Sequence, residues 1–171
     1  MENVIIRPLS GNEATINALA VLLVETVAHG GSVSFMHPFP AADARAFWQQ
    51  SLQAAAQGAR IVLGAFVEDT LAGTLTLLLE CPPNQPHRAE LAKMMTAVAH
   101  RGKGIARALV LEAERLAKAA GKTLINLDTA EEDGAAGLYE KMGYHLVGLI
   151  PDYALKPHGG LTGTLIYYKR I

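Results

Sequence analysis

Two glycines separated by a single residue, Gly102 and Gly104, stand just before a stretch with helical periodicity. Glycine lacks a side chain, so the backbone here can turn tightly and direct several N–H groups toward one ligand. Formal positive charge surrounds the pair, on Arg101, Lys103 and Arg107. Phosphate oxygens suit such amides and such charge, and a turn with a purely structural role does not need the charge. We call residues 99–106 the cradle. Its sequence predicts a phosphate site rather than an ordinary strand-to-helix turn.

The helix that should follow the cradle runs from Arg107 to Ala120. Its apolar side chains recur at spacings of three and four residues, which predicts one buried stripe. They are Ala106, directly before this range, and Leu109, Val110, Ala113, Ala117 and Ala120 within it. The positive end of the helix dipole would then face the cradle and add to its attraction for an anion.

The elements that position the cradle are expected to form a mixed α/β domain. Strands are expected over residues 4–7, 60–68, 71–79, 89–96, 123–128 and 144–150, with a final strand ending at Arg170. The first helix should follow a capping box at Ser10 to Glu13 and end near Ala28, and further helices should cover 41–57 and 134–142. Loops are expected at 29–40, 81–88 and 151–160. The strand before the cradle, the long helix and the next strand should form one right-handed crossover.

Composition excludes several classes of protein. The chain of 171 residues, half of them apolar, is long enough for one domain over residues 1–171. A net charge of −1 argues against nucleic acid or an anionic membrane as the main partner. Cys81 is the single cysteine and the histidines show no paired metal spacing, so we expect neither a disulfide within the chain nor a metal site. The apolar runs are too short to span a bilayer, and we expect a cytoplasmic protein, with a homodimer as the working hypothesis for its assembly.

Two motifs resemble those of the GNAT superfamily of acetyl-CoA-dependent acetyltransferases. Arg101 to Ala106 resembles its pyrophosphate-binding pattern, in which Arg or Gln is followed by two residues, Gly, one residue, and Gly or Ala. Leu138 to Tyr144 resembles its late Leu-Tyr-Glu-Lys-x-Gly-Phe/Tyr segment. The resemblance implies an α/β fold (α+β mixed sheet) with flanking helices and a splayed central strand pair, and acetyl-CoA as the cosubstrate. The chain departs from the pattern at Glu132, where many members have Asn, and at Val98, where Pro is frequent.

Further segments resemble the acetyltransferases of this superfamily that detoxify tabtoxin-type antibiotics. These segments are residues 22–27, 31–36, 88–90, 127–129 and 147–153, and they extend from the first helix to the last strand. The resemblance implies a small, polar, amino-acid-like acceptor such as tabtoxinine-β-lactam, and substrate contacts at Phe35, Met36 and Tyr153. Amines of peptides or proteins are the alternative acceptors.

Acetyl transfer to an amine requires removal of a proton, because a protonated amine is not a nucleophile and its usual pKa lies between about 8 and about 10. A carboxylate can accept that proton. Glu90 lies on the strand before the cradle and Asp128 ends the strand after the long helix, so both should lie near the crevice of a parallel pair. The resemblance implies a catalytic role for both. An exposed strand residue is the simpler interpretation of Glu90, and a turn or helix cap that of Asp128.

The departing thiolate needs a proton in turn, since its conjugate acid has a pKa of about 8.5. The resemblance implies that Tyr139 supplies this proton, while an aromatic side chain packed between helix and sheet is the alternative. It also implies that Met94, Met95 and Thr96 contact the pantetheine arm and the acetyl group mainly through their backbone groups.

Two other classes of function share parts of the pattern. Gly102 and Gly104, followed by Asp128, partly imitate a dinucleotide fingerprint, but Arg107 stands at the place of its third glycine. A non-catalytic CoA sensor would keep the cradle and have no need of proton-handling residues. The presence of a full set of such residues favours an enzyme.

Overall fold

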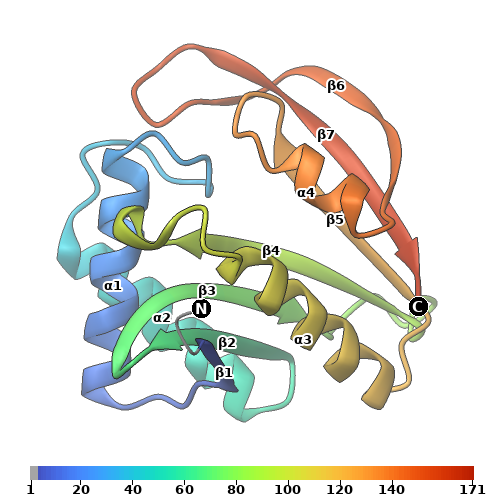
Figure 1. Cartoon of the computed structure of the whole chain (residues 1–171), viewed down its shortest axis with the longest axis horizontal. Helices are drawn as coiled ribbons and strands as arrows, with labels where there is room; N and C mark the ends of the chain where they lie inside the picture. Colours follow the sequence, from blue (N-terminus) through green and yellow to red (C-terminus); the bar gives the residue numbers. More distant parts are fainter. Residues whose placement is uncertain (1–3) are drawn as a thin grey trace.

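A computed structural model describes residues 4–171 as a seven-stranded mixed sheet with helices on both faces (Figure 1). The strands are β1 (Val4–Pro8), β2 (Arg60–Val67), β3 (Thr70–Leu78), β4 (Arg88–Thr96), β5 (Leu124–Ala130), β6 (His145–Leu155) and β7 (Leu161–Arg170). Their order across the sheet is β1-β2-β3-β4-β5-β7-β6. The helices are α1 (Glu13–Ala28), α2 (Ala41–Ala56), α3 (Ile105–Ala119) and α4 (Ala136–Lys141), and a short 3₁₀ turn covers Val98–His100. The predicted mixed α/β architecture is confirmed.

The two central strands, β4 and β5, are the parallel pair of this sheet, and they separate along their length (Figure 1). They are paired only at Arg88↔Leu124, Ala89↔Ile125 and Glu90↔Asn126. Beyond Glu90 the edge of β4 that faces β5 has no strand partner, so backbone N–H and C=O groups there are free to meet a ligand. This is the splayed strand pair that the resemblance to the GNAT superfamily implied.

The helices cover opposite faces of the sheet, as the alternation along β2 shows. Val62 packs in a cluster with α1 and α2, whereas the next residue, Leu63, packs in a cluster with α3. Successive side chains of a strand point to opposite faces, so α3 covers the face opposite to α1 and α2. Trp48 of α2 is completely buried at the centre of its cluster. Among the described residues, no helix has both the length and the apolar character needed to cross a bilayer.

The long helix α3 follows the predicted pattern with two differences. Leu109, Val110, Ala113 and Ala117 are buried as expected, but Ala120 lies past the helix end and is exposed. The helix begins earlier than predicted, at Ile105, whose side chain is 1 % exposed. Starting the helix directly after Gly104 brings its first amides to the cradle.

Two other predicted features were wrong in detail. Asn12, not Ser10, caps α1, and its side-chain oxygen accepts a hydrogen bond from the Thr15 amide at 2.9 Å. The predicted loop from residue 151 is instead the second half of β6, which pairs with β7 as far as Leu155↔Leu161. Pro151 is accommodated because it falls at an irregularity of the ladder on an edge strand, where a missing N–H removes no required bond.

Candidate active site

The cradle links the strand β4 to α3 and exposes its backbone. Gly102 and Gly104 have φ values of 76° and 82°, in the left-handed region that favours glycine. A Cβ atom added at either residue would meet no protein atom within 4 Å. Since Gly104 is the N-cap of α3 and offers no side-chain cap, the first amides of the helix point into this open space. The arrangement fits an anion that approaches the backbone closely.

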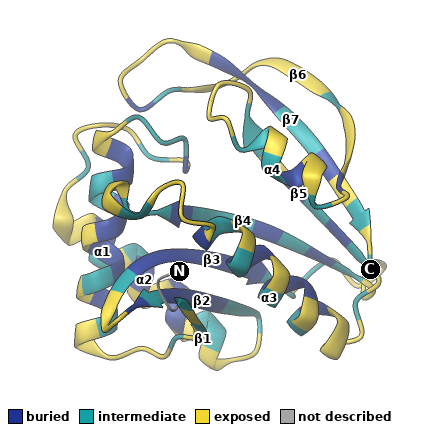
Figure 2. Ribbon diagram, in the orientation of Figure 1, coloured by how far each residue is buried: buried dark blue, intermediate teal, exposed yellow. Residues whose placement is uncertain are grey.

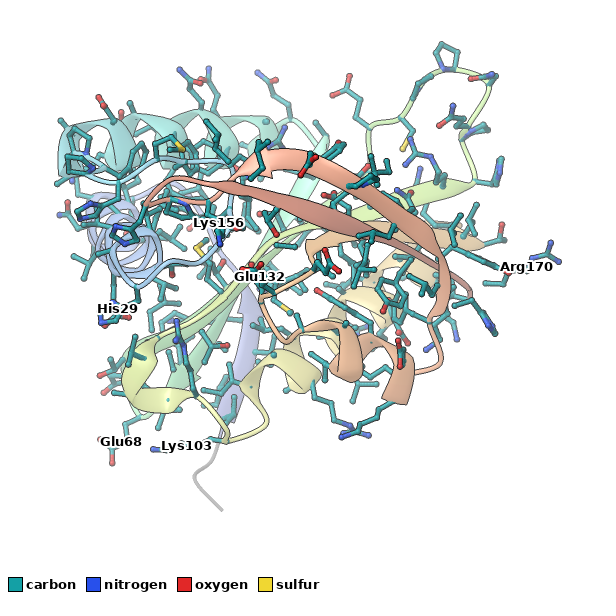
Figure 3. The ribbon with its side chains drawn as sticks, turned by 90° about the horizontal axis from the view of Figure 1, so that it is seen from above. His29, Glu68, Lys103, Glu132, Lys156 and Arg170 are labelled. Atoms are coloured by element: carbon teal, nitrogen blue, oxygen red, sulfur yellow. The ribbon has the colours of Figure 1, made fainter. Side chains whose placement is uncertain are left out.

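Positive side chains surround these amides, as the sequence predicted. Arg101, Lys103 and Arg107 are all exposed, and Figure 3 shows the Lys103 side chain on the outer surface. The Nε of Arg101 lies 3.5 Å from the carbonyl oxygen of Thr96, which turns this side chain back toward β4. Arg101 also lines the neighbouring cavity, so the cradle and the cavity are continuous.

An open cavity of about 420 Å³ lies along the free edge of β4. Its walls come from β4 and the cradle, from the end of α1 with the loop that follows it, and from β5 and α4 with the segment between them. The residues are Thr26, His29 to Ser34, Leu91 to Thr96, Arg101, Asp128, Thr129, Asp133, Ala135 and Tyr139. The splayed strands thus contain a space of the size that small-molecule ligands occupy.

The loop between α1 and α2 is tied to the turn between β6 and β7. The amide of His37 donates a hydrogen bond to the Pro157 carbonyl at 2.9 Å, and Nε2 of His158 donates to the Ala28 carbonyl at 2.9 Å. The two histidine rings are 4.4 Å apart. These contacts fix the loop that forms one wall of the cavity.

Asp128 and Glu90 occupy the same face of the sheet but differ in their surroundings. Asp128 is exposed to the cavity, and its Oδ2 lies 3.1 Å from the Thr164 hydroxyl. Glu90 does not line the cavity. Its carboxylate lies 3.3 Å from the guanidinium of Arg88, which also donates to the Asn126 side chain at 2.6 Å. The catalytic roles of both carboxylates stay predictions, and Asp128 is the one in direct contact with the cavity.

Tyr139 joins α4 to the cavity and is only 4 % exposed. Its hydroxyl lies 3.7 Å from the sulfur of Met94, and its ring packs at 5.6 Å from that of Tyr144. Burial raises the pKa of the Tyr139 phenol well above its usual value, and the charge of Asp128 raises it further. The hydroxyl is therefore protonated at neutral pH and able to donate. The structure thus shows the packing role of Tyr139, and its chemical role stays a prediction.

The residues predicted to contact acetyl-CoA differ in whether their side chains or only their backbone groups are accessible to a ligand. Met95 and Ile105 are buried, at 3 % and 1 % exposed, so their side chains belong to the core and their backbones alone can meet a ligand. Met94 and Thr96 line the cavity. Ala106 is half-buried in the first turn of α3.

The predicted acceptor contacts, in contrast, lie outside the lining of the cavity. Phe35 stacks on Phe39 with ring centroids 4.4 Å apart, while Met36 and Tyr153 are 44 % and 55 % exposed. Their role as substrate contacts stays a prediction.

Glu132, which stands where many members of the superfamily have Asn, does not line the cavity. Its carboxylate pairs with Lys156 at 3.1 Å, and Figure 3 shows the two side chains pointing toward one another. The neighbouring Asp133 lines the cavity instead and accepts a hydrogen bond from the Ser32 amide at 3.2 Å. Burial raises the pKa of Asp133, against the opposing effects of the Ser32 amide and the charge of Arg101.

Sequence reasoning missed Lys93, which lines the cavity from β4. Burial lowers the pKa of its ammonium, while the charges of Asp128 and Glu90 act in the opposite direction. A single lysine in a strand gives no periodic signal, so only the folded structure places it there. Among residues 4–171, no cluster of three or more His, Cys, Asp or Glu side chains is arranged to hold a metal ion.

Comparison with known proteins gives one family. The model of the acetyltransferase (GNAT) family matches residues 26–144, which include β4, the cradle, α3, β5 and α4.

Solved structures share the whole fold at low sequence identity. Ribosomal-protein-alanine N-acetyltransferase from Brucella melitensis superposes with a TM-score of 0.80 at 21 % identity, covering 98 % of this chain and 99 % of that one. YncA from Salmonella typhimurium, a candidate acetyltransferase solved with its cofactor acetyl-CoA, gives 0.79 at 16 % identity, with 98 % and 93 % covered. A protein assigned as a candidate phosphinothricin N-acetyltransferase gives 0.78 at 19 % identity, with 98 % of both chains covered. At these identities the likeness shows a common fold.

Proposed function

The chain belongs to the acetyltransferase (GNAT) family, and from this premise we propose that it transfers the acetyl group of acetyl-CoA to the amino group of a small, polar, amino-acid-like molecule. The observation that carries the proposal is the continuity of two sites. An uncapped helix N-terminus with open glycines adjoins a cavity that holds a carboxylate, an ammonium and a buried phenol.

The cradle fits the pyrophosphate of acetyl-CoA. Gly102 and Gly104 leave the backbone open, and the amides at the start of α3 face that space. Arg101, Lys103 and Arg107 supply charge for the phosphate oxygens. The free edge of β4 at Met94 to Thr96 would hold the pantetheine arm by backbone hydrogen bonds. When bound, acetyl-CoA supplies the acetyl group as a thioester.

Asp128 and Glu90 would accept the proton of the acceptor amine. Asp128 faces the cavity directly, and the Thr164 hydroxyl orients its carboxylate. Glu90 is held by Arg88 on the same sheet face, so a water molecule would have to relay a proton to it. Asp128 is therefore the base that we favour.

Tyr139 would donate a hydrogen bond to the departing thiolate. Its raised pKa keeps the phenol protonated, which suits a donor. Complete proton transfer to a thiolate, whose conjugate acid has a pKa of about 8.5, would require the phenol pKa to fall when the cosubstrate is bound.

The proposed class of acceptor rests on sequence resemblance and on the structural neighbours. The segments that resemble the tabtoxin resistance protein include the loop that forms the cavity wall, and one structural neighbour is assigned as a candidate phosphinothricin N-acetyltransferase. Both acceptors resemble amino acids, and tabtoxinine-β-lactam is the compound that we favour, with antibiotic resistance as the role. The protein-directed enzyme from Brucella melitensis supports the alternative of a peptide or protein amine.

A free-thiol release assay with acetyl-CoA tests the proposal. The acceptors are amino acids, amino-acid antibiotics including tabtoxinine-β-lactam, polyamines and short peptides. We expect thiol release to depend on an amino-acid-like amine and on Asp128. Release with peptides alone would favour the alternative acceptor, and no release with any amine would contradict the proposed function.

We also propose that the enzyme is a homodimer in the cytoplasm, where acetyl-CoA is available and Cys81 stays reduced. The edge strand β6 supports the dimer: it has one neighbouring strand and is almost wholly exposed (Figure 2). Its exposed apolar residues include Leu146, Val147, Leu149 and Ile150. Two β6 strands related by a two-fold axis could pair and cover these side chains.

Light scattering after size exclusion tests the dimer. We expect a dimer for the parent and a monomer for Val147→Lys, whose parent side chain is 64 % exposed on β6. Val21→Lys, at a valine 71 % exposed on α1, is the matched control and should stay a dimer. A monomeric parent would contradict this proposal.

A further inference from the structure

Lys93 lies at a bulge in β4. Pairing with β3 passes from Thr74↔Met95 directly to Thr76↔Ala92, so Lys93 and Met94 lie opposite the single residue Leu75. The φ of Lys93 is 52°, in the left-handed region that disfavours residues with a side chain. A bulge redirects the side chain of its extra residue, and strained backbone of this kind concentrates at functional sites. The bulge and the strained backbone together indicate that the orientation of the Lys93 side chain serves a function.

The ammonium of Lys93 is held by aromatic rings and one hydroxyl. Its Nζ lies 5.7 Å from the ring centroid of Phe35 and 6.0 Å from that of Phe47. It donates a hydrogen bond to Ser34 Oγ at 2.9 Å, and Ser34 itself has a φ of 79°. Two strained residues, 59 positions apart in the chain, thus meet at this contact.

No carboxylate among residues 4–171 forms an ion pair with Lys93. An ammonium has three donors, and Ser34 accepts from one of them. Partial burial opposes the charge, since a cation that loses part of its water is less stable unless an anion or hydrogen bonds compensate. The charges of Asp128 and Glu90 compensate only in part, because the pKa of Lys93 remains below its usual value. The Lys93 ammonium thus carries a positive charge that no carboxylate of the described residues pairs with directly.

Lys93 and Asp128 line the same cavity, one cationic and one anionic. A ligand that complements this pair carries an anionic group and an amine close together. An α-amino acid has this arrangement, because its carboxylate and its amino group share one carbon atom. A carboxylate on Nζ of Lys93 would leave the amine free to face Asp128.

We propose that Lys93 binds the free carboxylate of the acceptor and thereby makes the enzyme specific for amino-acid-like zwitterions. The inference rests on the proposed function and names the residue that selects the substrate class. Ser34 and the two phenylalanine rings position the ammonium. Amides, esters and internal residues of peptides lack the carboxylate and would be poor acceptors.

The test compares acceptors that differ only in the carboxylate. Thiol release from acetyl-CoA is measured with each common amino acid and with its α-carboxamide, for the parent and for Lys93→Met. A hydrogen bond to a charged partner corresponds to about 10- to 100-fold in affinity, so the parent should prefer the acid over the amide by this factor in kcat/KM. Lys93→Met should lose the preference by losing activity on the acid, while its activity on the amide stays the same.

Two further variants and a binding measurement distinguish a role of Lys93 in substrate specificity from a role in the stability of the protein. Lys93→Arg keeps the charge and should keep part of the preference. Lys118→Met, at an exposed lysine of α3, is the matched control and should behave as the parent. Calorimetry with CoA should give the same affinity for Lys93→Met as for the parent, and thermal melts confirm that each variant is folded. If Lys93→Met does not fold, Lys93→Gln takes its place.

The outcomes of these measurements distinguish failure of the Lys93 proposal from failure of the proposed function. Equal loss of activity on acid and amide in Lys93→Met, or weaker CoA binding, would overturn the role of Lys93. Thiol release by the parent without a preference for the acid would overturn it as well, while leaving N-acetyl transfer in place. No release with any amine would overturn the proposed function and, with it, the inference.

Discussion

Replacing Gly104 by Ala tests whether the cradle binds CoA through its backbone. The substitution adds a Cβ to a residue with a φ of 82° and no protein atom within 4 Å of the new carbon. Its cost to the unliganded protein is therefore conformational, about 1–2 kcal/mol for an alanine in the left-handed region. Gly121 offers a matched control, because it has a φ of 75°, equally open surroundings, and a place at the opposite end of α3.

Both variants should lose similar stability. For a domain of this size, 1 kcal/mol shifts the Tm by about 2–4 °C, so each alanine should lower the Tm by about 2–8 °C. The two variants should differ in their affinity for CoA. In Gly104→Ala the methyl group enters the space that the pyrophosphate would occupy, and we expect at least about a 10-fold loss, equal to about 1.4 kcal/mol. Gly121→Ala should bind CoA as the parent does.

Isothermal titration calorimetry with CoA, together with thermal melts, measures both effects. Equal CoA affinity in Gly104→Ala and Gly121→Ala would refute the assignment of the cradle. Tight binding of NADH without binding of CoA would revive the dinucleotide alternative.

Three further predictions concern the cavity. Tyr139→Phe should melt close to the parent, since among residues 4–171 the one hydrogen bond of its hydroxyl is a long one of 3.7 Å to the Met94 sulfur, yet lose about 10²-fold in kcat; full activity would leave Tyr139 as a packing residue. Asp128→Asn should lower turnover more than Glu90→Gln at neutral pH, and both deficits should shrink at high pH, where the amine is already neutral; a deficit unchanged across pH would indicate positioning instead. The Tm of Lys93→Met, taken relative to that of the parent, should fall as the pH rises toward 10.5, because the lowered pKa of Lys93 means that its charge opposes folding below that pH; a relative Tm that rises with pH would have the wrong sign.

Local signals in the sequence were sufficient to predict the conformation of the cradle and the helix that follows it. Glycines at left-handed positions and apolar spacings of three and four residues are properties of neighbouring residues, and Gly104 and Leu109 lie where these rules place them. The splayed strands were predicted from resemblance alone, since no local pattern specifies where a parallel pair separates.

Contacts between distant residues could not be predicted. The amide of Val98 donates to the carboxylate of Glu25 at 3.1 Å, and Lys169 pairs with Glu114 at 2.8 Å, across 73 and 55 positions of the chain. Such partners depend on how α1 and α3 pack against the sheet. The bulge at Lys93 is a further example, because one extra residue in a ladder depends on the register with β3.

Mass spectrometry of the products shows whether the acetyl group of acetyl-CoA reaches the nitrogen of the acceptor. The enzyme is incubated with acetyl-CoA that carries a deuterated acetyl group and with the amino-acid acceptor that releases most thiol. We predict that the labelled acetyl group appears on the nitrogen of the acceptor, at a rate equal to that of thiol release. Thiol release that yields only labelled acetate, or a label on any atom other than nitrogen, would contradict N-acetyl transfer by this protein.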